Sequence, residues 1–185
     1  VSGMFLVVGL SLSLLISQQL FLMLLLYLFT TSCYSWTLKQ YVMIDVIVLS
    51  LLYTLRILVG SVAIGVTTSS WLLAFAVFMF LSLALVKRCS ELVSLDKSKI
   101  EAASGRDYRT SDLIVLWPLG VGTAVSSVVV FGLFISAPET ATRYESPIIL
   151  WLVALGLIYW LSRLWIKTAR GEMHDDPVVF AIQDK

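Results

Sequence analysis

Charged residues are scarce in this sequence, and none occurs before Lys39. Charged side chains make up 14% of the 185 residues and hydrophobic side chains 59%, whereas soluble domains carry roughly 25% and 45–50%. Too little polar surface remains to coat a water-soluble globule. The formal net charge of +1 also offers no basic surface for nucleic acid. We therefore expect an integral membrane protein without a nucleic-acid partner.

The sequence also lacks the usual signatures of metal and nucleophile chemistry. It contains two cysteines, Cys33 and Cys89, which lie in or beside apolar stretches without the spacing of metal ligands, so we expect buried thiols. The one histidine stands in the segment 174–176 with two aspartates, which falls short of a zinc signature. A phosphate-binding GxxxxGK[ST] loop, a GxSxG elbow and an HExxH helix are all missing, so those mechanisms have no support.

Long apolar runs account for most of the chain. Because a bilayer core of about 30 Å requires about 20 apolar residues per helix, the runs predict six transmembrane helices. These are residues 1–16, 20–33, 42–65, 71–86, 113–135 and 148–166. The predicted fold class is all-α, a polytopic transmembrane helical bundle that forms a single domain over residues 1–185. The chain is expected to be a piece of a longer protein.

The positive charges segregate to one side of the predicted bundle. Residues 34–41, the long loop 87–112 and the C-terminal tail fall on one side, which holds eleven of the thirteen Lys and Arg residues when Arg163 is included. The other side has Arg143 alone, and Arg56 lies inside a span. By the positive-inside rule the side with eleven is cytoplasmic.

The loop 87–112 concentrates the polar chemistry. It has 26 residues and holds 11 of the 25 charged residues. A long polar loop is either solvated surface or a functional segment. Lys87 and Glu91, four residues apart, would share a helical face. Such a face suits a surface ion pair, or equally a site where cations meet phosphate and carboxylates meet Mg²⁺.

Two ionisable residues lie within the predicted helix 42–65. Such groups are costly in a span and normally face a cavity or pair with one another. Asp45 and Arg56 are eleven residues apart, about 16 Å along a helix, and cannot pair directly. Asp45 is one turn inside the cytoplasmic end and can reach the interface, whereas Arg56 is deeper and is expected to face a cavity.

Several segments together resemble the UbiA-type membrane prenyltransferase superfamily. The resemblance is nearest to the bacterial branch that includes decaprenyl-phosphate phosphoribosyltransferase, and it covers most of the chain from residue 34 onward. The segments that carry it are YSWTLK at 34–39, LRILVGSVAIG at 55–65, LALVKRCSEL at 83–92, GRDYRTSDL at 105–113 and RGEMHDDPVVFAIQD at 170–184.

The resemblance implies a nine-helix fold around a lipid-accessible cavity, of which this chain would supply helices three to eight. Two acidic motifs of the family hold Mg²⁺ and a diphosphate under cytoplasmic loops. The first motif would lie upstream of this chain. The second falls where helix 71–86 enters the long loop, and it points to Glu91 and Asp96 as catalytic and metal-binding residues. The expected substrate-binding residues are Lys39, Arg56, Lys87, Arg88, Arg106 and Tyr108.

The resemblance therefore predicts an enzyme of the bacterial inner membrane, a prenyltransferase. It would transfer a polyprenyl group to an acceptor with loss of pyrophosphate, with Mg²⁺ as the cofactor. Phosphoribosyl transfer from a phosphoribosyl donor to polyprenyl phosphate is the alternative within the same branch. A transporter or a non-catalytic scaffold subunit is the alternative from another class, although no internal repeat of the kind common in transporters is visible.

The topology can be tested by cysteine labelling in spheroplasts, in a variant without Cys33 and Cys89. A cysteine at Ser104, in the loop 87–112, should resist an impermeant reagent added from outside, because that loop is expected in the cytoplasm. A cysteine at Ser146, in the opposite loop, should react. External labelling at position 104 would reverse the orientation.

Overall fold

The computed structural model describes residues 2–99, 105–144 and 146–173 of the chain. Within these residues the protein is helical and has no strand. The helices are α1 (Ser2–Ile16), α2 (Gln18–Trp36), α3 (Ile44–Ala63), α4 (Ser70–Lys97), α5 (Leu113–Ser136), the short α6 (Pro138–Arg143) and α7 (Leu150–Arg170). The predicted all-α helical bundle is therefore confirmed, and each of the six expected helices has a counterpart.

Five of these helices, α2, α3, α4, α5 and α7, are long and apolar enough to cross a bilayer, and α1 is a shorter apolar helix. The protein is thus an integral membrane protein by the length and composition of its helices. The polar break expected near residue 17 occurs: Ser17 is the N-cap of α2, and its side chain accepts a hydrogen bond from the backbone N–H of Gln19. This cap ends the continuous apolar stretch and starts a new helix.

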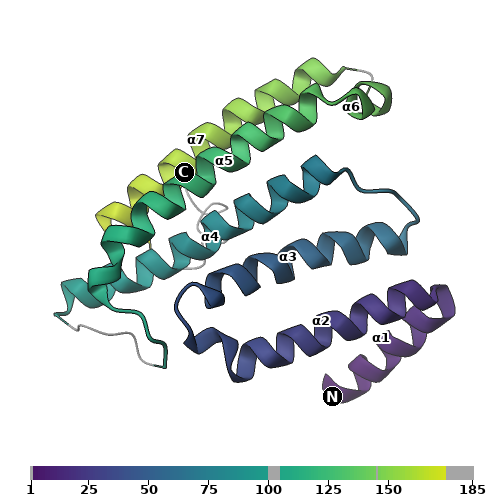
Figure 1. The fold of residues 1–185 in the computed structure, drawn as a ribbon, viewed down its shortest axis with the longest axis horizontal. Helices are drawn as coiled ribbons and strands as arrows, with labels where there is room; N and C mark the ends of the chain where they lie inside the picture. Colours follow the sequence, from purple (N-terminus) through teal and green to yellow (C-terminus); the bar gives the residue numbers. More distant parts are fainter. Residues whose placement is uncertain (1, 100–104, 145, 174–185) are drawn as a thin grey trace.

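The helices lie in chain order from α1 at one edge to the α5 and α7 pair at the other (Figure 1). Helix α4 is central, because α3, α5 and α7 all pack against it, while α2 packs between α1 and α3. The main buried core is formed around α4, and its fully buried members include Leu85, Val86, Cys89 and Leu92. The prediction of a buried thiol is confirmed for Cys89, whereas Cys33 is partly exposed.

The predicted loop 87–112 is wrong over its first eleven residues, because α4 continues to Lys97. Val86, Cys89 and Leu92 are each fully buried, and their spacing of three residues keeps an apolar face on the core. Hydropathy alone predicts that the helix ends before the charged pair Lys87 and Arg88. The buried face of the helix continues beyond that pair. The end of α4 therefore carries charged side chains on a rigid helix instead of a loop.

A polar and steric contact fixes α4, α5 and α7 together. The indole N–H of Trp165 donates to the Ser82 hydroxyl over 3.0 Å, and that hydroxyl donates to the carbonyl of Gly120 over 3.1 Å. A Cβ atom at Gly120 would lie 2.1 Å from the Trp165 ring. The absence of a side chain at this glycine thus permits the close approach of α5 and α7.

Gly120→Ala should destabilise the protein by about 1–3 kcal/mol, because the new methyl group overlaps the Trp165 ring and forces the helices apart. Gly122→Ala is the matched control, since a Cβ there meets no atom within 4 Å. The midpoint of unfolding in detergent measures both. Equal unfolding midpoints for the two variants would mean that α5 and α7 can move apart without loss of stability.

A candidate anion site built on buried ion pairs

Four charged side chains meet at one end of the bundle, and we call them the charge cluster: Asp45, Arg88, Glu91 and Arg106. Asp45 lies in the first turn of α3, and Arg88 and Glu91 lie in the last third of α4. Arg106 belongs to the connection between α4 and α5. The cluster thus brings together residues up to 61 positions apart in the sequence.

The inner half of the cluster is the pair Asp45 and Arg88. The Arg88 Nη2 atom lies 2.8 Å from Asp45 Oδ2, and the side chains are 2% and 0% exposed. This contact is an ion pair without good hydrogen-bond alignment. The Tyr34 hydroxyl donates to the other oxygen, Oδ1, over 2.7 Å. The Oδ1 atom is thus hydrogen-bonded, whereas Oδ2 has an ion-pair contact but no hydrogen-bond partner within the described part of the chain. The ion pair and the tyrosine bond partly offset the cost of removing the carboxylate from water.

The outer half is the pair Glu91 and Arg106, which are 35% and 27% exposed. The Arg106 Nη1 atom lies 3.4 Å from each Glu91 oxygen, and its Nε lies 3.9 Å from Asp45 Oδ2. These contacts are long for charge-assisted hydrogen bonds. Arg88 also donates to Glu91, so this carboxylate accepts from both arginines. The outer pair is therefore the looser and more exposed part of the cluster.

Tyr108 holds the connecting segment against the cluster. It is fully buried, its hydroxyl accepts the backbone N–H of Met43 over 3.0 Å, and the Arg88 guanidinium lies 5.4 Å from its ring centre. Met43 has a φ of 66°, a strained value that this bond helps to maintain. Burial raises the pKa of Tyr108, so the phenol stays protonated and neutral at physiological pH.

The arginines retain donor capacity. The Nε atoms of Arg88 and Arg106 are both buried and have no hydrogen-bond partner within the described part of the chain. A buried guanidinium N–H without an acceptor is unfavourable. An anionic oxygen is the acceptor that suits the guanidinium group best. The cluster therefore has the chemistry of an anion site whose arginines are held in place by carboxylates.

The structure brings together four of the residues expected from the sequence, namely Arg88, Glu91, Arg106 and Tyr108. Asp96 is exposed on α4, five residues beyond Glu91 and therefore on a different helical face. Lys39 is half-buried in the short helix Leu38–Gln40. Neither side chain forms an ion pair with another described residue. Lys87 is exposed, whereas its neighbour Arg88 is buried, so the two basic side chains diverge.

Arg56 lies away from the cluster, on the exposed side of α3. Its Nε donates to the Tyr27 hydroxyl over 2.8 Å, and its guanidinium stacks on the rings of Tyr27 and Tyr53, at 5.3 Å and 4.9 Å from their centres. Two aromatic side chains thus accompany this intramembrane cation. As the helix spacing predicted, Arg56 and Asp45 do not pair.

Asp45 and Tyr34 were not among the residues expected at the site. The position of Asp45 near the end of a span predicts a side chain that reaches the membrane interface, but this residue is fully buried. The sequence signal for this ion pair was an acidic residue, Asp45, in one predicted span and a basic residue, Arg88, just after the end of another. Sequence position alone does not show that α3 and α4 place them opposite each other.

The described carboxylates do not form a Mg²⁺ site by themselves. No group of three or more His, Cys, Asp or Glu side chains that could hold a metal occurs in the part of the chain that the structure describes. Asp45 and Glu91 are each occupied by arginine, and Asp96 lies on another face of α4. The pair Glu91 and Asp96 therefore does not converge on one metal, and we assign no step to a metal ion here.

Asp45→Ala should destabilise the protein by about 3–5 kcal/mol, because it leaves Arg88 charged and buried without its partner. Asp96→Ala is the matched control on the exposed face of α4 and should change stability by less than about 0.5 kcal/mol. Unfolding midpoints of the purified variants test this. Adding Arg88→Met to Asp45→Ala should recover part of the lost stability. If the stability losses of the two single variants simply add in the double variant, the pairing is contradicted.

Two known proteins are similar to this chain over almost its whole length. The uncharacterized protein y4nM of Sinorhizobium fredii is 38% identical over 182 residues, which are 96% of this chain and 34% of y4nM. The nodulation protein NoeC of Azorhizobium caulinodans is 29% identical over 167 residues, which are 90% of this chain and 54% of NoeC. The chain thus spans about a third to a half of the length of these relatives. No protein-family model matches the chain.

Proposed function

We propose that this chain is part of a membrane transferase that acts on a polyprenyl substrate with loss of pyrophosphate. The observation that supports the proposal is the charge cluster, in which the buried Nε groups of Arg88 and Arg106 have no acceptor among the described residues. The cluster stands at one end of a bundle whose helices are apolar enough to span a bilayer. A substrate with a long hydrocarbon tail and a phosphorylated end requires both features. Its tail needs an apolar environment, and its phosphate needs cationic hydrogen-bond donors.

In the proposed reaction, the bond between C1 of the allylic group and the diphosphate oxygen breaks. Pyrophosphate leaves with the electron pair, a nucleophilic atom of the acceptor forms the new bond to C1, and the acceptor releases its proton to water. Negative charge develops on the departing oxygen, and preorganised arginines stabilise it. Arg88 is immobilised by Asp45 and Tyr34 holds that carboxylate in turn, so little reorganisation is needed at this cation.

Glu91 acts in this proposal as a positioning residue. The cluster contains two cations and two carboxylates, so its formal charge is balanced before an anion arrives. The long Arg106–Glu91 contacts of 3.4 Å are the ones that a diphosphate can replace, because this pair is partly exposed. Arg106 would then bind phosphate while Arg88 stays fixed by Asp45.

The family resemblance also leads us to propose Mg²⁺ as the cofactor. It likewise leads us to propose the bacterial inner membrane as the location. The ion usually keeps several waters and is held by one or two carboxylates together with substrate phosphates. The substrate would therefore supply most of its ligands. The side that carries the cluster is proposed to face the cytoplasm, in keeping with the distribution of Lys and Arg.

Phosphoribosyl transfer to polyprenyl phosphate is the second candidate. There the phosphate oxygen of the lipid attacks C1 of a phosphoribosyl diphosphate, and pyrophosphate again leaves. The resemblance to the branch that includes decaprenyl-phosphate phosphoribosyltransferase favours it, and the two arginines and two carboxylates of the charge cluster would serve the leaving pyrophosphate in the same way. The alternative from another class, a transporter or a scaffold subunit, would catalyse neither reaction.

In the intact protein, Arg106→Gln and Glu91→Gln should each lower turnover at least tenfold, which corresponds to about 1.4 kcal/mol of lost transition-state stabilisation. The first removes a phosphate ligand and the second removes the carboxylate that orients both arginines. Asp96→Asn, on the exposed face of α4, should retain wild-type turnover.

The measurement is pyrophosphate release in proteoliposomes with saturating Mg²⁺. One series contains polyprenyl diphosphate with membrane-extracted acceptors, and the other contains polyprenyl phosphate with phosphoribosyl diphosphate. The series that shows turnover identifies the reaction. Absence of turnover in both series, or turnover within twofold of wild type for both cluster variants, would reject the transferase and favour a transporter or scaffold.

A further inference from the structure

The Arg56 side chain lies inside a membrane-spanning helix and has no carboxylate partner among the described residues. Arg56 stands twelve residues after the start of α3 and seven before its end. Its side chain is exposed on the surface of the bundle, and in a membrane this surface faces lipid or another helix. A charged group in such a place is costly unless an opposite charge meets it.

The guanidinium of Arg56 is directed toward the middle of the bilayer and not toward the nearer boundary. The nearer end of α3 is Ala63, yet the guanidinium stacks on the ring of Tyr53, one turn earlier, at 4.9 Å from its centre. Its Nε and Nη2 atoms both donate to the hydroxyl of Tyr27, the central residue of α2, nine positions from each end. Arginines near a boundary extend toward water, so these tyrosines hold the charge at depth.

The two tyrosines satisfy only part of the guanidinium group. The Tyr27 phenol is a neutral acceptor and receives two of the five N–H donors of Arg56. The described residues give the Nη1 atom no acceptor. A guanidinium that stacks on aromatic rings keeps its planar edge available for a carboxylate. Arg56 therefore retains its net charge and part of its donor capacity for an anion.

Gly60 lies one turn beyond Arg56 on the same side of α3. It is exposed, and a Cβ atom there would meet no atom within 4 Å. A glycine inside a helix is unfavourable, and no described residue occupies the space that it leaves. In membranes, small residues on a helix surface let a second helix approach closely. We call the exposed surface formed by Arg56 and Gly60 the α3 face.

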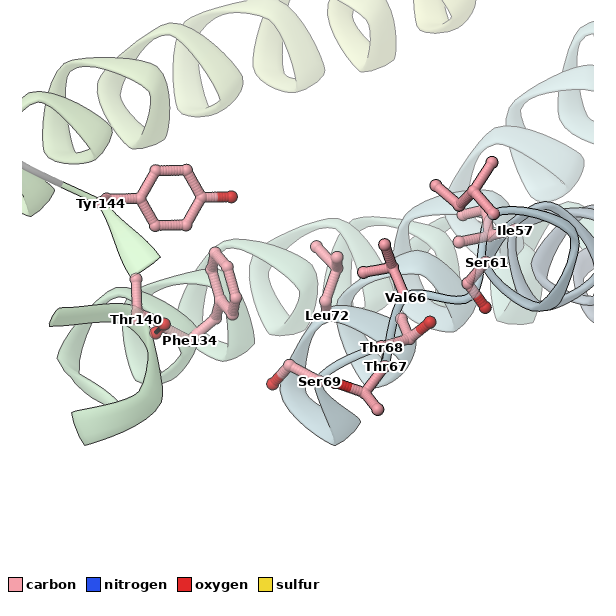
Figure 2. A pocket seen from close by; sticks show the side chains of 11 residues that line it. Ile57, Ser61, Val66, Thr67, Thr68, Ser69, Leu72, Phe134, Thr140 and Tyr144 are labelled. Atoms are coloured by element: carbon pink, nitrogen blue, oxygen red, sulfur yellow. Dashed lines mark hydrogen bonds between the residues drawn. The ribbon is translucent and has the colours of Figure 1, made fainter. Parts of the chain in front are cut away.

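The α3 face is distinct from the other features of α3. A cavity of about 320 Å³ lies between the end of α3 and the start of α4, and α3 contributes Ile57 and Ser61 to its lining (Figure 2). Ile57 is turned by about 100° around the helix from Arg56. Asp45, in the charge cluster, is about 16 Å from Arg56 along the helix axis. An anion bound at the charge cluster therefore leaves Arg56 without a partner.

We propose that the α3 face docks a transmembrane helix other than α1–α7, and that this helix carries an aspartate or glutamate near its middle. Its carboxylate accepts hydrogen bonds from Arg56 at a depth where no water competes. Its backbone approaches α3 at Gly60, one turn away. The partner is thus defined by two properties, a mid-bilayer carboxylate and a helical backbone that can come close.

Other occupants fit the α3 face less well. A second copy of this chain lacks the carboxylate: Asp45 is the one acidic residue of α1, α2, α3, α5 and α7, and it is 0% exposed and paired with Arg88. The acidic residues of α4 stand in its charged last third. A lipid phosphate lies at headgroup level, whereas Tyr27 holds the guanidinium at depth. The inference does not rest on the proposed transferase activity, because it uses no residue of the charge cluster.

The probe is a synthetic leucine–alanine transmembrane peptide of about 20 residues with one central glutamate. Matched peptides carry glutamine or lysine at the same place. The purified protein and the peptide carry a fluorescent donor and acceptor, and energy transfer in phosphatidylcholine liposomes is followed as added lipid dilutes both. The wild type should associate at least fivefold more strongly with the glutamate peptide than with the glutamine peptide. The lysine peptide should associate least, because it repels Arg56.

Arg56→Gln should abolish the preference for glutamate over glutamine. Tyr27→Phe is the control for the loss of internal hydrogen bonds, since it removes the acceptor of Arg56 but keeps the charge, and it should keep the preference. Gly60→Leu should weaken association with the glutamate peptide at least threefold, because the new side chain occupies the approach. Gly156→Leu, on α7, is the matched control and should behave as the wild type, since a Cβ at either glycine meets no atom within 4 Å.

A glutamate preference that requires Arg56, and that Gly60→Leu but not Gly156→Leu weakens, supports the proposal. Equal association of the glutamate and glutamine peptides with the wild type overturns it, and so does a preference that survives in Arg56→Gln.

Two further series test the other occupants. One measures energy transfer between two labelled copies of the protein without peptide, and the other repeats the peptide series in liposomes that contain phosphatidylglycerol. Transfer between copies that depends on Arg56 would assign the α3 face to a second copy. Loss of the glutamate preference in the anionic lipid would assign it to a lipid phosphate. Either result overturns the proposal.

Discussion

The ion pair between Asp45 and Arg88 is the interaction on which the polar end of this protein depends. Both side chains are almost completely buried, and each would be very unfavourable in a membrane protein without the other. The pair therefore requires α3 and α4 to keep one relative position. Tyr34 extends the constraint to α2 through its bond to Asp45, so three helices share one polar contact.

Once that contact is fixed, the connection between α4 and α5 has a place to dock. The Tyr108 ring lies against the Arg88 guanidinium and its hydroxyl accepts the N–H of Met43. The backbone N–H of Asp107 donates to the carbonyl of Gln40 over 3.0 Å. These bonds bring Arg106 to Glu91. A buried inner pair and a looser, partly exposed outer pair result.

The two ends of the bundle differ in chemistry. One end holds the paired charges of the charge cluster, and the other holds a cavity whose described lining residues are uncharged. Helices α3 and α4 contribute to both ends. The similarity to y4nM and NoeC extends over 96% and 90% of this chain, so both ends lie within the stretch that is compared. Those relatives are longer than this chain.

The sequence by itself determined the membrane class, the six main helices and the break at Ser17, because hydropathy and capping are local properties of neighbouring residues. A family resemblance also pointed to Arg88, Glu91, Arg106 and Tyr108, which lie close together in the fold. It did not determine the extent of α4 to Lys97. That boundary depends on a buried face, and burial depends on neighbouring helices.

Only the tertiary structure decided that Asp45 belongs with Arg88 and that Asp96 lies elsewhere. The two paired residues are 43 positions apart, and their meeting depends on the packing of α3 against α4. Glu91 and Asp96 are close in sequence, but five residues turn a helix through more than one full circle and leave them on different faces. Distance along a chain is a poor measure of distance in space, so the partners of a charged group became known only with the fold.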